Sequence, residues 1–299
     1  MERLGFIGTG VMGTGIINNL LKAGYEVTIY NRTKAHAQSL LDAGARWAET
    51  PAKVAADTAI TFSMVGFPAD VEDIYFGEHS ILAGAKPGSL VVDMTTSTPT
   101  LAKRISATAA ERGITALDSP VSGGDIGAKN GTLAIMVGGD EAAMPQLAPI
   151  YKVIGSAYHY FGEAGSGQHA KMANQIMIAG TMTGMSELLA YANAAGLNLQ
   201  DVLATVGAGS AANWSLANYA PRVLANDFTP GFFAKHFLKD LRIALNEADS
   251  MGLELPATKT AKDLYERLVN DGHGDDGTQA LIKLYKGWQD IAKTTQQSK

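Results

Sequence analysis

The sequence contains no cysteine. This absence excludes disulfide bonds, thiolate nucleophiles and thiolate-bound metals together. The six histidines form no H-E-x-x-H motif or comparable cluster, so no metal site is expected. No G-x-S-x-G motif is present either, which argues against the commonest class of serine hydrolase.

Long hydrophobic runs are also missing. The apolar start, Leu4–Ile7, is far too short to span a bilayer, and glycines interrupt it. We therefore expect no membrane or secretory segment, and a cytoplasmic protein. The net charge of −5 provides no basic excess, so nucleic acid is not expected as the main partner.

The composition is that of an ordinary folded protein. Hydrophobic residues make up 46% of the chain and charged residues 18%. At 299 residues the chain is long enough for two domains.

The first half alternates short β-branched runs with helix-patterned segments. The expected strands are Arg3–Gly8, Glu26–Tyr30, Ala59–Met64, Ser89–Asp93, Thr115–Asp118 and Ala134–Gly138. The expected helices between them are Met12–Ala23, Ala35–Ala43, Thr98–Arg112 and Glu141–Ile150. Strands separated by helices of this length predict an α/β Rossmann domain with a doubly wound, mostly parallel sheet.

After about residue 163 the strand signals stop. The pattern predicts one long helix over Gly165–Gly196, then helices near Leu199–Gly207, Trp214–Leu224, Phe237–Gly252, Leu255–Asn270 and Gln279–Ala292. The Gly/Ser-rich stretch Gly162–Gly167 is the expected boundary. We therefore predict a cofactor-binding domain over residues 1–163 and an all-α domain, built on the long helix, over residues 164–299.

The long helix carries a G-x-x-x-G pair, Gly180 and Gly184. A membrane helix is excluded because Lys171 and Glu187 lie on the same segment. Close packing of helices in the core is the preferred interpretation.

A glycine-rich turn follows the first expected strand and opens the first helix. Gly8, Gly10 and Gly13 form G-x-G-x-x-G, with Met12 inside the motif. The glycines permit a tight turn, close approach of the backbone to a pyrophosphate, and packing of helix on strand. The helix N-terminus offers free N–H groups and a positive dipole end to phosphates. These four residues are predicted to bind a dinucleotide.

The end of the second strand indicates which dinucleotide. A carboxylate at this place would accept a hydrogen bond from a ribose 2′-hydroxyl and repel a 2′-phosphate, but the chain has Asn31, Arg32 and Thr33. A guanidinium can pair with a phosphate, and the amide and hydroxyl can donate to it. We therefore predict NADP(H), with a solvated loop arginine as the alternative.

Two further stretches offer chemistry. In Asp118–Gly124, the hydroxyl of Ser122 and the N–H groups of Gly123 and Gly124 could bind a carboxylate or oxyanion, or the segment could be a plain turn. On the long helix, Asn174 and Gln175 lie three and four residues after Lys171. In a closed cleft, desolvation or a neighbouring cation lowers the pKa of a lysine, which can then exchange protons near neutral pH.

The local sequence pattern alone favours a non-catalytic role for both lysines. Lys171 would be a surface residue, and Lys239 would be a solvated charge beside Asp240. The stretches GFIGTGVMG, VVDMTTS, DSPVSGG, GSGQHAKMANQ and HFLKDL change this, because together they resemble the β-hydroxyacid dehydrogenase family in order and spacing. That family includes 3-hydroxyisobutyrate dehydrogenases, tartronate semialdehyde reductases, glyoxylate/succinic semialdehyde reductases and, more distantly, 6-phosphogluconate dehydrogenase. The resemblance covers essentially the whole chain.

The resemblance implies a role for each motif. Lys171 would be the general acid/base, Ser122, Gly123 and Gly124 would bind the substrate carboxylate, and Asn174 and Gln175 would also contact substrate. Thr96 would lie near the nicotinamide and Lys239 close to the cofactor, in an active site between the two domains. A homodimer or homotetramer is expected from the same resemblance.

One departure points to a branch of the family. Asparagine commonly stands four residues after the catalytic lysine, where this chain has Gln175, preceded by Asn174. The Lys-x-x-Asn-Gln form resembles tartronate semialdehyde reductases, as does the late stretch Asp271–Leu281. Asp125, after the Ser-Gly-Gly loop, would disfavour substrates with additional negative charge nearby.

Four substrates remain open: tartronate semialdehyde, succinic semialdehyde, glyoxylate and methylmalonate semialdehyde. The alternatives to the family's reaction are an NADPH-dependent imine reductase and a non-catalytic NADPH-binding protein. Imine reductases share the fold and NADPH use but usually lack the lysine found here at Lys171. A non-catalytic NADPH-binding protein would be expected to have lost its active-site lysine, whereas this chain retains both Lys171 and Lys239.

Overall fold

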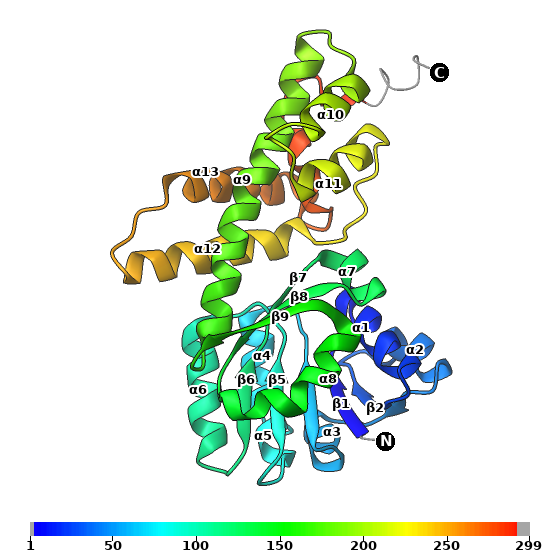
Figure 1. Ribbon diagram of the computed structural model, residues 1–299, viewed down its shortest axis with the longest axis vertical. Coiled ribbons are helices and arrows are strands. Elements are labelled where there is room, and N and C mark those ends of the chain that lie inside the picture. The colour runs from blue at the N-terminus through cyan, green and yellow to red at the C-terminus, as the bar shows by residue number, and fades with distance from the viewer. Residues whose placement is uncertain (1–2, 292–299) are drawn as a thin grey trace. The chain divides into compact units, whose positions relative to one another are not determined.

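The computed structural model describes residues 3–291 and divides into two compact units, an N-terminal unit ending at Lys171 and a C-terminal unit beginning at Met172 (Figure 1). The long helix α9 (Ser166–Ala194) begins in the first unit and continues in the second.

The N-terminal unit is built on one sheet. Its strands are β1 (Arg3–Ile7), β2 (Glu26–Tyr30), β3 (Arg46–Trp47), β4 (Ile60–Ser63), β5 (Leu90–Asp93), β6 (Thr115–Asp118), β7 (Val121–Ser122), β8 (Leu133–Gly138) and β9 (Gly155–Gly162). They lie in the order β3-β2-β1-β4-β5-β6-β8-β7, and β9 also pairs with β8. The pairs from β3 to β6 are parallel, whereas β8 runs antiparallel to β6 and β7. The strand order reverses at β1 and β4, where a doubly wound sheet opens a crevice at its carboxyl edge.

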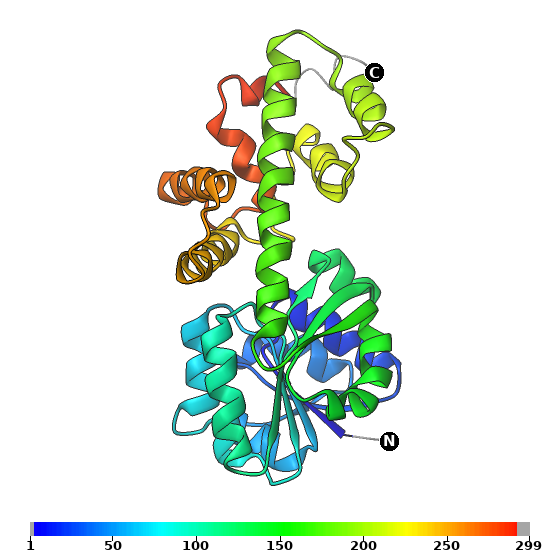
Figure 2. The same ribbon diagram turned by 60° about the vertical axis from the view of Figure 1, so that its left-hand side comes forward.

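Helices cover both faces of this sheet (Figure 2). The α-helices of the unit before α9 are α1 (Val11–Lys22), α2 (Gln38–Asp42), α3 (Pro51–Asp57), α4 (Pro68–Phe76), α5 (Ile81–Gly84), α6 (Pro99–Ala110), α7 (Gly124–Asn130) and α8 (Met144–Ile154), with short 3₁₀ turns at Lys34–Ala37 and Glu141–Ala143. One core cluster joins the strands to α1, α2 and α8, and a second joins them to α3, α4, α5 and α6. Because helices cover both faces of the sheet, every residue of β4 and β5 is buried, including the polar Thr61, Ser63 and Asp93.

The C-terminal unit is helical. Its helices after α9 are α10 (Leu199–Gly207), α11 (Trp214–Leu224), α12 (Ala234–Ser250) and α13 (Pro256–Leu268), followed by a π-helical turn at Val269–His273 and a 3₁₀ helix at Thr278–Leu284. Within this unit, α10 and α11 lie on one side of α9 and α12 and α13 on the other (Figure 2). Met182, Met185 and Leu189 of α9 pack in a core cluster with α10 and α11, and Ala179 packs with α12 and α13.

The predicted fold class is confirmed: a Rossmann domain with a mostly parallel sheet is followed by a helical domain. Each expected strand is present within a residue or so of its predicted ends. The strands β3, β7 and β9 were not predicted. For β3 and β7 the reason is that two residues are too few to show an alternating pattern. The expected helix Gln279–Ala292 is instead the 3₁₀ helix up to Leu284, and Ala292 lies outside the described residues.

The interpretation of the G-x-x-x-G pair as close core packing is wrong for the described residues. Gly180 and Gly184 are exposed on α9, and a Cβ at either would meet no described atom within 4 Å. Among residues 3–291, no helix is both long and apolar enough to cross a membrane.

Candidate active site

The glycine turn between β1 and α1 has the geometry that a dinucleotide loop needs. Gly8 has φ +102°, a region that favours glycine, and a Cβ there would lie 2.0 Å from the carbonyl oxygen of Met64. A Cβ at Gly13 would lie 2.2 Å from the carbonyl oxygen of Gly8, so only glycine allows the helix this close to the turn. By contrast, Gly10 opens onto free space and forms the N-cap of α1 without a side-chain cap. The turn therefore fits a bound pyrophosphate. Met12, in the first turn of α1, is partly buried against the core.

Asn31 organises the loop at the end of β2. Its Oδ1 accepts a hydrogen bond from the Thr9 N–H at 3.1 Å, and its Nδ2 donates to the Thr33 carbonyl at 2.9 Å. The side chain therefore ties the glycine turn to the loop after β2. Thr33 precedes the 3₁₀ turn and is exposed.

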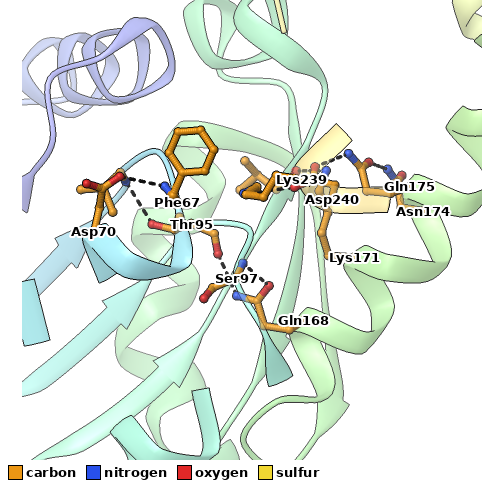
Figure 3. Close-up of polar contacts among 12 residues, drawn as sticks. Phe67, Asp70, Thr95, Ser97, Gln168, Lys171, Asn174, Gln175, Lys239 and Asp240 are labelled. Atoms are coloured by element: carbon orange, nitrogen blue, oxygen red, sulfur yellow. Dashed lines mark hydrogen bonds and ion pairs between the residues drawn. The ribbon is translucent and has the colours of Figure 1, made fainter. Parts of the chain in front are cut away.

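Arg32 is the exposed cation beside that loop. Its side chain is 87% exposed, and one guanidinium nitrogen lies 3.4 Å from Oδ1 of Asp70. The other carboxylate oxygen of Asp70 accepts from the Phe67 N–H at 3.0 Å at the start of α4 (Figure 3). Asp70 therefore links Arg32 to the loop after β4. An ion pair this exposed is weak, so the guanidinium is available to a competing anion.

The Ser-Gly-Gly loop lies where β7 ends and α7 begins. Ser122 pairs with Ala134 of the antiparallel strand β8 and is half-buried. Gly123 and Gly124 have φ +130° and +62°, which residues with a Cβ rarely adopt. The sequence Gly-Gly is therefore required by the backbone of this turn, and both N–H groups lie at the start of a helix.

Lys171 is buried, with 6% of its surface exposed. Its Nζ donates a hydrogen bond to the Val121 carbonyl at 2.8 Å. Val121 directly precedes Ser122 in β7, so the lysine amine lies beside the strand that leads into the Ser-Gly-Gly loop. The alternative of a surface lysine is wrong, and the two motifs belong to one cluster in the N-terminal unit.

Asp118, at the end of β6, holds the start of α9. Its carboxylate accepts from the Gly165 N–H at 2.7 Å and from the Gln168 N–H at 2.8 Å. Burial raises the pKa of Asp118, and these two hydrogen bonds oppose the rise. An acceptor at a helix N-terminus satisfies N–H groups that have no partner inside the helix. The carboxylate thus fixes the helix turn that precedes Lys171.

Gln168 connects the same helix to the loop after β5. Its Oε1 accepts from the Ser97 N–H at 2.9 Å, and its Nε2 donates to the Thr95 carbonyl at 2.7 Å (Figure 3). Gln168 is fully buried, as are Thr95 and Ser97 to within 1%. Thr96, the predicted nicotinamide neighbour, is the half-buried residue between them.

The carboxylate of Asp93, the last residue of β5, holds the start of the loop after β5. The Ser63 hydroxyl donates to its carboxylate at 2.9 Å, and the Thr95 N–H donates at 3.1 Å. Burial raises the pKa of Asp93 to about 6, although the hydrogen bonds from Thr95 and Ser63 act in the opposite direction.

The C-terminal unit holds a second polar cluster (Figure 3). Asn174 Nδ2 donates to Gln175 Oε1 at 2.7 Å, and Gln175 Nε2 donates to Asp240 Oδ2 at 2.6 Å. Lys239 Nζ lies 3.1 Å from Asp240 Oδ1. Asp240 is fully buried and only 12% of the Lys239 side chain is exposed, so the alternative of a solvated charge pair is wrong. Gln175 has both ends of its amide engaged within the protein, and the longer side chain allows it to reach Asp240.

Sequence reasoning missed the roles of Gln168, Asp118 and Asp240. All three stand inside motifs that the sequence singled out: Asp118 opens DSPVSGG, Gln168 precedes Lys171 by one helix turn, and Asp240 follows Lys239. The sequence did not show that these three side chains are buried, because Asp and Gln are usually exposed unless they have hydrogen-bond partners.

The chain matches two family descriptions that between them cover most of its length. Residues 3–162 match the NAD binding domain of 6-phosphogluconate dehydrogenase. Residues 165–285 match the NAD-binding domain of NADP-dependent 3-hydroxyisobutyrate dehydrogenase.

Individual proteins agree with these matches. The chain is 46% identical over 281 residues to a probable 3-hydroxyisobutyrate dehydrogenase-like protein, mitochondrial, of Arabidopsis thaliana, covering 94% of this chain and 84% of that protein. It is 36% identical over 281 residues to 2-hydroxy-3-oxopropionate reductase of Escherichia coli (strain K12), covering 94% and 96%.

A solved structure is similar over nearly the whole chain. The structure of Mycobacterium tuberculosis 3-hydroxyisobutyrate dehydrogenase with L-serine is 29% identical, with a TM-score of 0.85, covering 95% of this chain and 99% of that one. The glycine turn, the buried lysine and these matches agree: the chain is an NAD(P)-dependent oxidoreductase and belongs to the β-hydroxyacid dehydrogenase family, among the 3-hydroxyisobutyrate dehydrogenase-like members.

Proposed function

We propose that the protein catalyses reversible hydride transfer between NADP(H) and a small carboxylic acid carrying a hydroxyl or an aldehyde group. The observation that carries this proposal is the hydrogen bond from Lys171 Nζ to the Val121 carbonyl, next to the Ser-Gly-Gly loop. It brings a buried proton donor close to a loop suited to a carboxylate, within one unit of the chain.

Lys171 is the proposed general acid/base. When bound, the nicotinamide cofactor supplies or accepts the hydride. In the reducing direction, the ammonium form of Lys171 gives a proton to the carbonyl oxygen while the carbonyl carbon becomes a CH–OH carbon, and the lysine is left neutral. In the oxidising direction, neutral Lys171 takes the hydroxyl proton.

The substrate carboxylate is assigned to Ser122, Gly123 and Gly124. The hydroxyl and the N–H groups are donors without a large side chain in the way, so they suit a planar anion. Asn174 and Gln175 are proposed to complete the substrate site, with Gln175 also holding Asp240. The relative named 2-hydroxy-3-oxopropionate reductase supports a small aldehyde acid as substrate. Tartronate semialdehyde, succinic semialdehyde, glyoxylate and methylmalonate semialdehyde are the candidates.

NADP(H) is the proposed cofactor because of the cation at the end of β2. Arg32, Asn31 and Thr33 follow Tyr30 there, and no carboxylate stands among them to repel a 2′-phosphate. The exposed guanidinium of Arg32 is free to exchange its weak pair with Asp70 for a phosphate. Thr96 and Lys239 are proposed to lie near the cofactor.

We also propose a homodimer or homotetramer. One face of α9 exposes Met177 and Tyr191, at 67% and 76%, together with Gly180 and Gly184. Large apolar side chains beside glycines on an exposed helix suit the close approach of a second helix.

The first test is steady-state oxidation of NADPH and NADH against the four aldehyde acids, compared by kcat/KM. A marked NADPH preference with one best acid supports the proposal, and an NADH preference contradicts the role of Arg32. No turnover with any acid, while NADPH still binds, would favour an imine reductase or a non-catalytic NADPH-binding protein.

Lys171→Ala tests the acid/base role. We expect kcat to fall by about 100-fold or more, within the range that general acid–base catalysis contributes, with little change in NADPH affinity. Lys152→Ala, at an exposed position on α8, is the matched control and should behave as wild type. A kcat for Lys171→Ala within about tenfold of wild type, a barrier change of about 1.4 kcal/mol, would exclude Lys171 as the acid.

A further inference from the structure

We infer that Gln168 is a positioning residue for the reaction: its side-chain amide fixes the backbone at Thr96 relative to Lys171. The inference rests on the proposed function, in which Thr96 lies near the nicotinamide and Lys171 transfers the proton. The structural basis is the pair of hydrogen bonds from one amide to the two peptide groups on either side of Thr96.

The two bonds constrain one residue. The Thr95 carbonyl belongs to the peptide group before Thr96, and the Ser97 N–H belongs to the peptide group after it. A rigid planar amide that accepts from one at 2.9 Å and donates to the other at 2.7 Å therefore holds both peptide planes that meet at the Cα of Thr96. Main-chain pairing between strands works in the same way, but here a single side chain replaces the strand.

The other end of the link is Lys171. Gln168 and Lys171 are three residues apart on α9, so they lie on the same side of the helix and about 4.5 Å apart along its axis. Asp118 fixes this turn of the helix through the Gly165 and Gln168 N–H groups. Buried hydrogen bonds of the Gln168 amide and the Asp118 carboxylate thus connect the Thr96 backbone to the turn of α9 that precedes Lys171.

The surroundings leave this arrangement little freedom. A Cβ at Gly167 would lie 2.5 Å from the Met136 carbonyl and 2.6 Å from the Asp118 carbonyl, so the helix start is packed directly on β6 and β8. Gln168 itself has no exposed surface. Water therefore has no direct access to replace the amide if it is removed, and Thr95 and Ser97 would each lose a buried partner.

The test is Gln168→Met, which keeps the length and apolar packing of the side chain and removes both hydrogen bonds. We expect kcat per NADPH-binding site to fall on the order of 100-fold, because small misplacement of reacting groups has effects of that size. The NADPH dissociation constant should stay within about threefold of wild type, equivalent to less than about 0.7 kcal/mol. The primary deuterium isotope effect with NADPH labelled at the transferred hydrogen should rise, since hydride transfer becomes slower than product release.

Gln279→Met is the matched control. Gln279 is also fully buried, and its Nε2 donates to the carbonyls of Asp227 and Thr229 in the C-terminal unit, neither of which has a role in the proposed reaction. It should lose stability as Gln168→Met does, but retain the wild-type kcat per site and isotope effect. A purely structural role for Gln168 would make the two variants alike, and that result would overturn the inference.

Amide hydrogen exchange gives a readout that does not depend on activity. In wild type, the Ser97 N–H should exchange far more slowly than in the unfolded chain, and in Gln168→Met its protection should drop while that of β1 is kept. An unprotected Ser97 in wild type would refute the inference even if the variant fails to fold. The proposed function would instead be refuted if the wild-type enzyme showed no turnover, or if the Lys171→Ala variant were fully active. If Lys171→Ala abolishes activity but Gln168→Met leaves kcat unchanged, the positioning role of Gln168 alone is refuted.

Discussion

The buried carboxyl of Asp93 should give the N-terminal unit a distinctive dependence of stability on pH. Asp93 lies at the end of β5, and its carboxylate accepts hydrogen bonds from the Ser63 hydroxyl and the Thr95 N–H. The Ser63 hydroxyl is also hydrogen-bonded to the Tyr75 hydroxyl. Its pKa is raised by burial from 3.8 to about 6, and Asp118 adds to the rise. The perturbation we propose is Asp93→Asn, which keeps the shape and an acceptor oxygen but does not titrate.

The sign follows from proton uptake. Because the folded state holds the proton of Asp93 more tightly than the unfolded chain does, the contribution of this group to stability is greatest below about pH 4 and is lost as the pH rises to about 6. The shift is about 2 pKa units, and each unit corresponds to about 1.4 kcal/mol, so the total is about 3 kcal/mol. Well above pH 6 the contribution of Asp93 to the free energy of unfolding should no longer change with pH.

The assay is the free energy of unfolding by urea at pH 4, 5, 6 and 7 for wild type and for Asp93→Asn. The stability of wild type relative to the variant should decrease by about 2.4 kcal/mol from pH 4 to pH 7, because part of the total is already lost at pH 4. Asp57→Asn, at a position on α3 paired only through the exposed i,i+4 contact with Lys53, is the control and should follow the wild-type curve. Wild-type and Asp93→Asn curves that run parallel across this range would refute the reasoning.

Two further substitutions test the two polar clusters, one around Asp118 and the other around Asp240. Gly167→Ala should lower the free energy of unfolding by about 1–3 kcal/mol, because its Cβ would lie 2.6 Å from the Asp118 carbonyl oxygen. Gly207→Ala, at the exposed end of α10 where a Cβ meets nothing within 4 Å, should leave stability equal or higher in thermal melts. Equal melting temperatures for the two variants would show that the helix start tolerates a larger side chain. Gln175→Leu should cost about 2 kcal/mol or more in urea unfolding, since the fully buried Asp240 carboxylate loses a donor at 2.6 Å. A loss below about 0.5 kcal/mol would mean that another group replaces the amide.

The sequence by itself determined the elements whose signals are local. The alternation of β-branched strands with amphipathic helices predicted the parallel sheet, and G-x-G-x-x-G after the first strand predicted the dinucleotide turn. These patterns are readable because burial on one or both faces of an element repeats with the period of that element. Gly8 and Gly123 stand inside glycine motifs that the sequence singled out, and the structure gives both a positive φ.

Only the tertiary structure decided which polar residues are buried and what they hold. The Ser97 N–H meets Gln168 across 71 residues of chain, the Gly165 N–H meets Asp118 across 47, and Gln175 meets Asp240 across 65. A glutamine on a helix has the same local pattern whether it faces water or a backbone carbonyl, so its neighbours in sequence carry no information about the contact. The partner is fixed when strands and helices pack, because a buried amide or carboxylate must then find donors and acceptors from whichever segment lies against it.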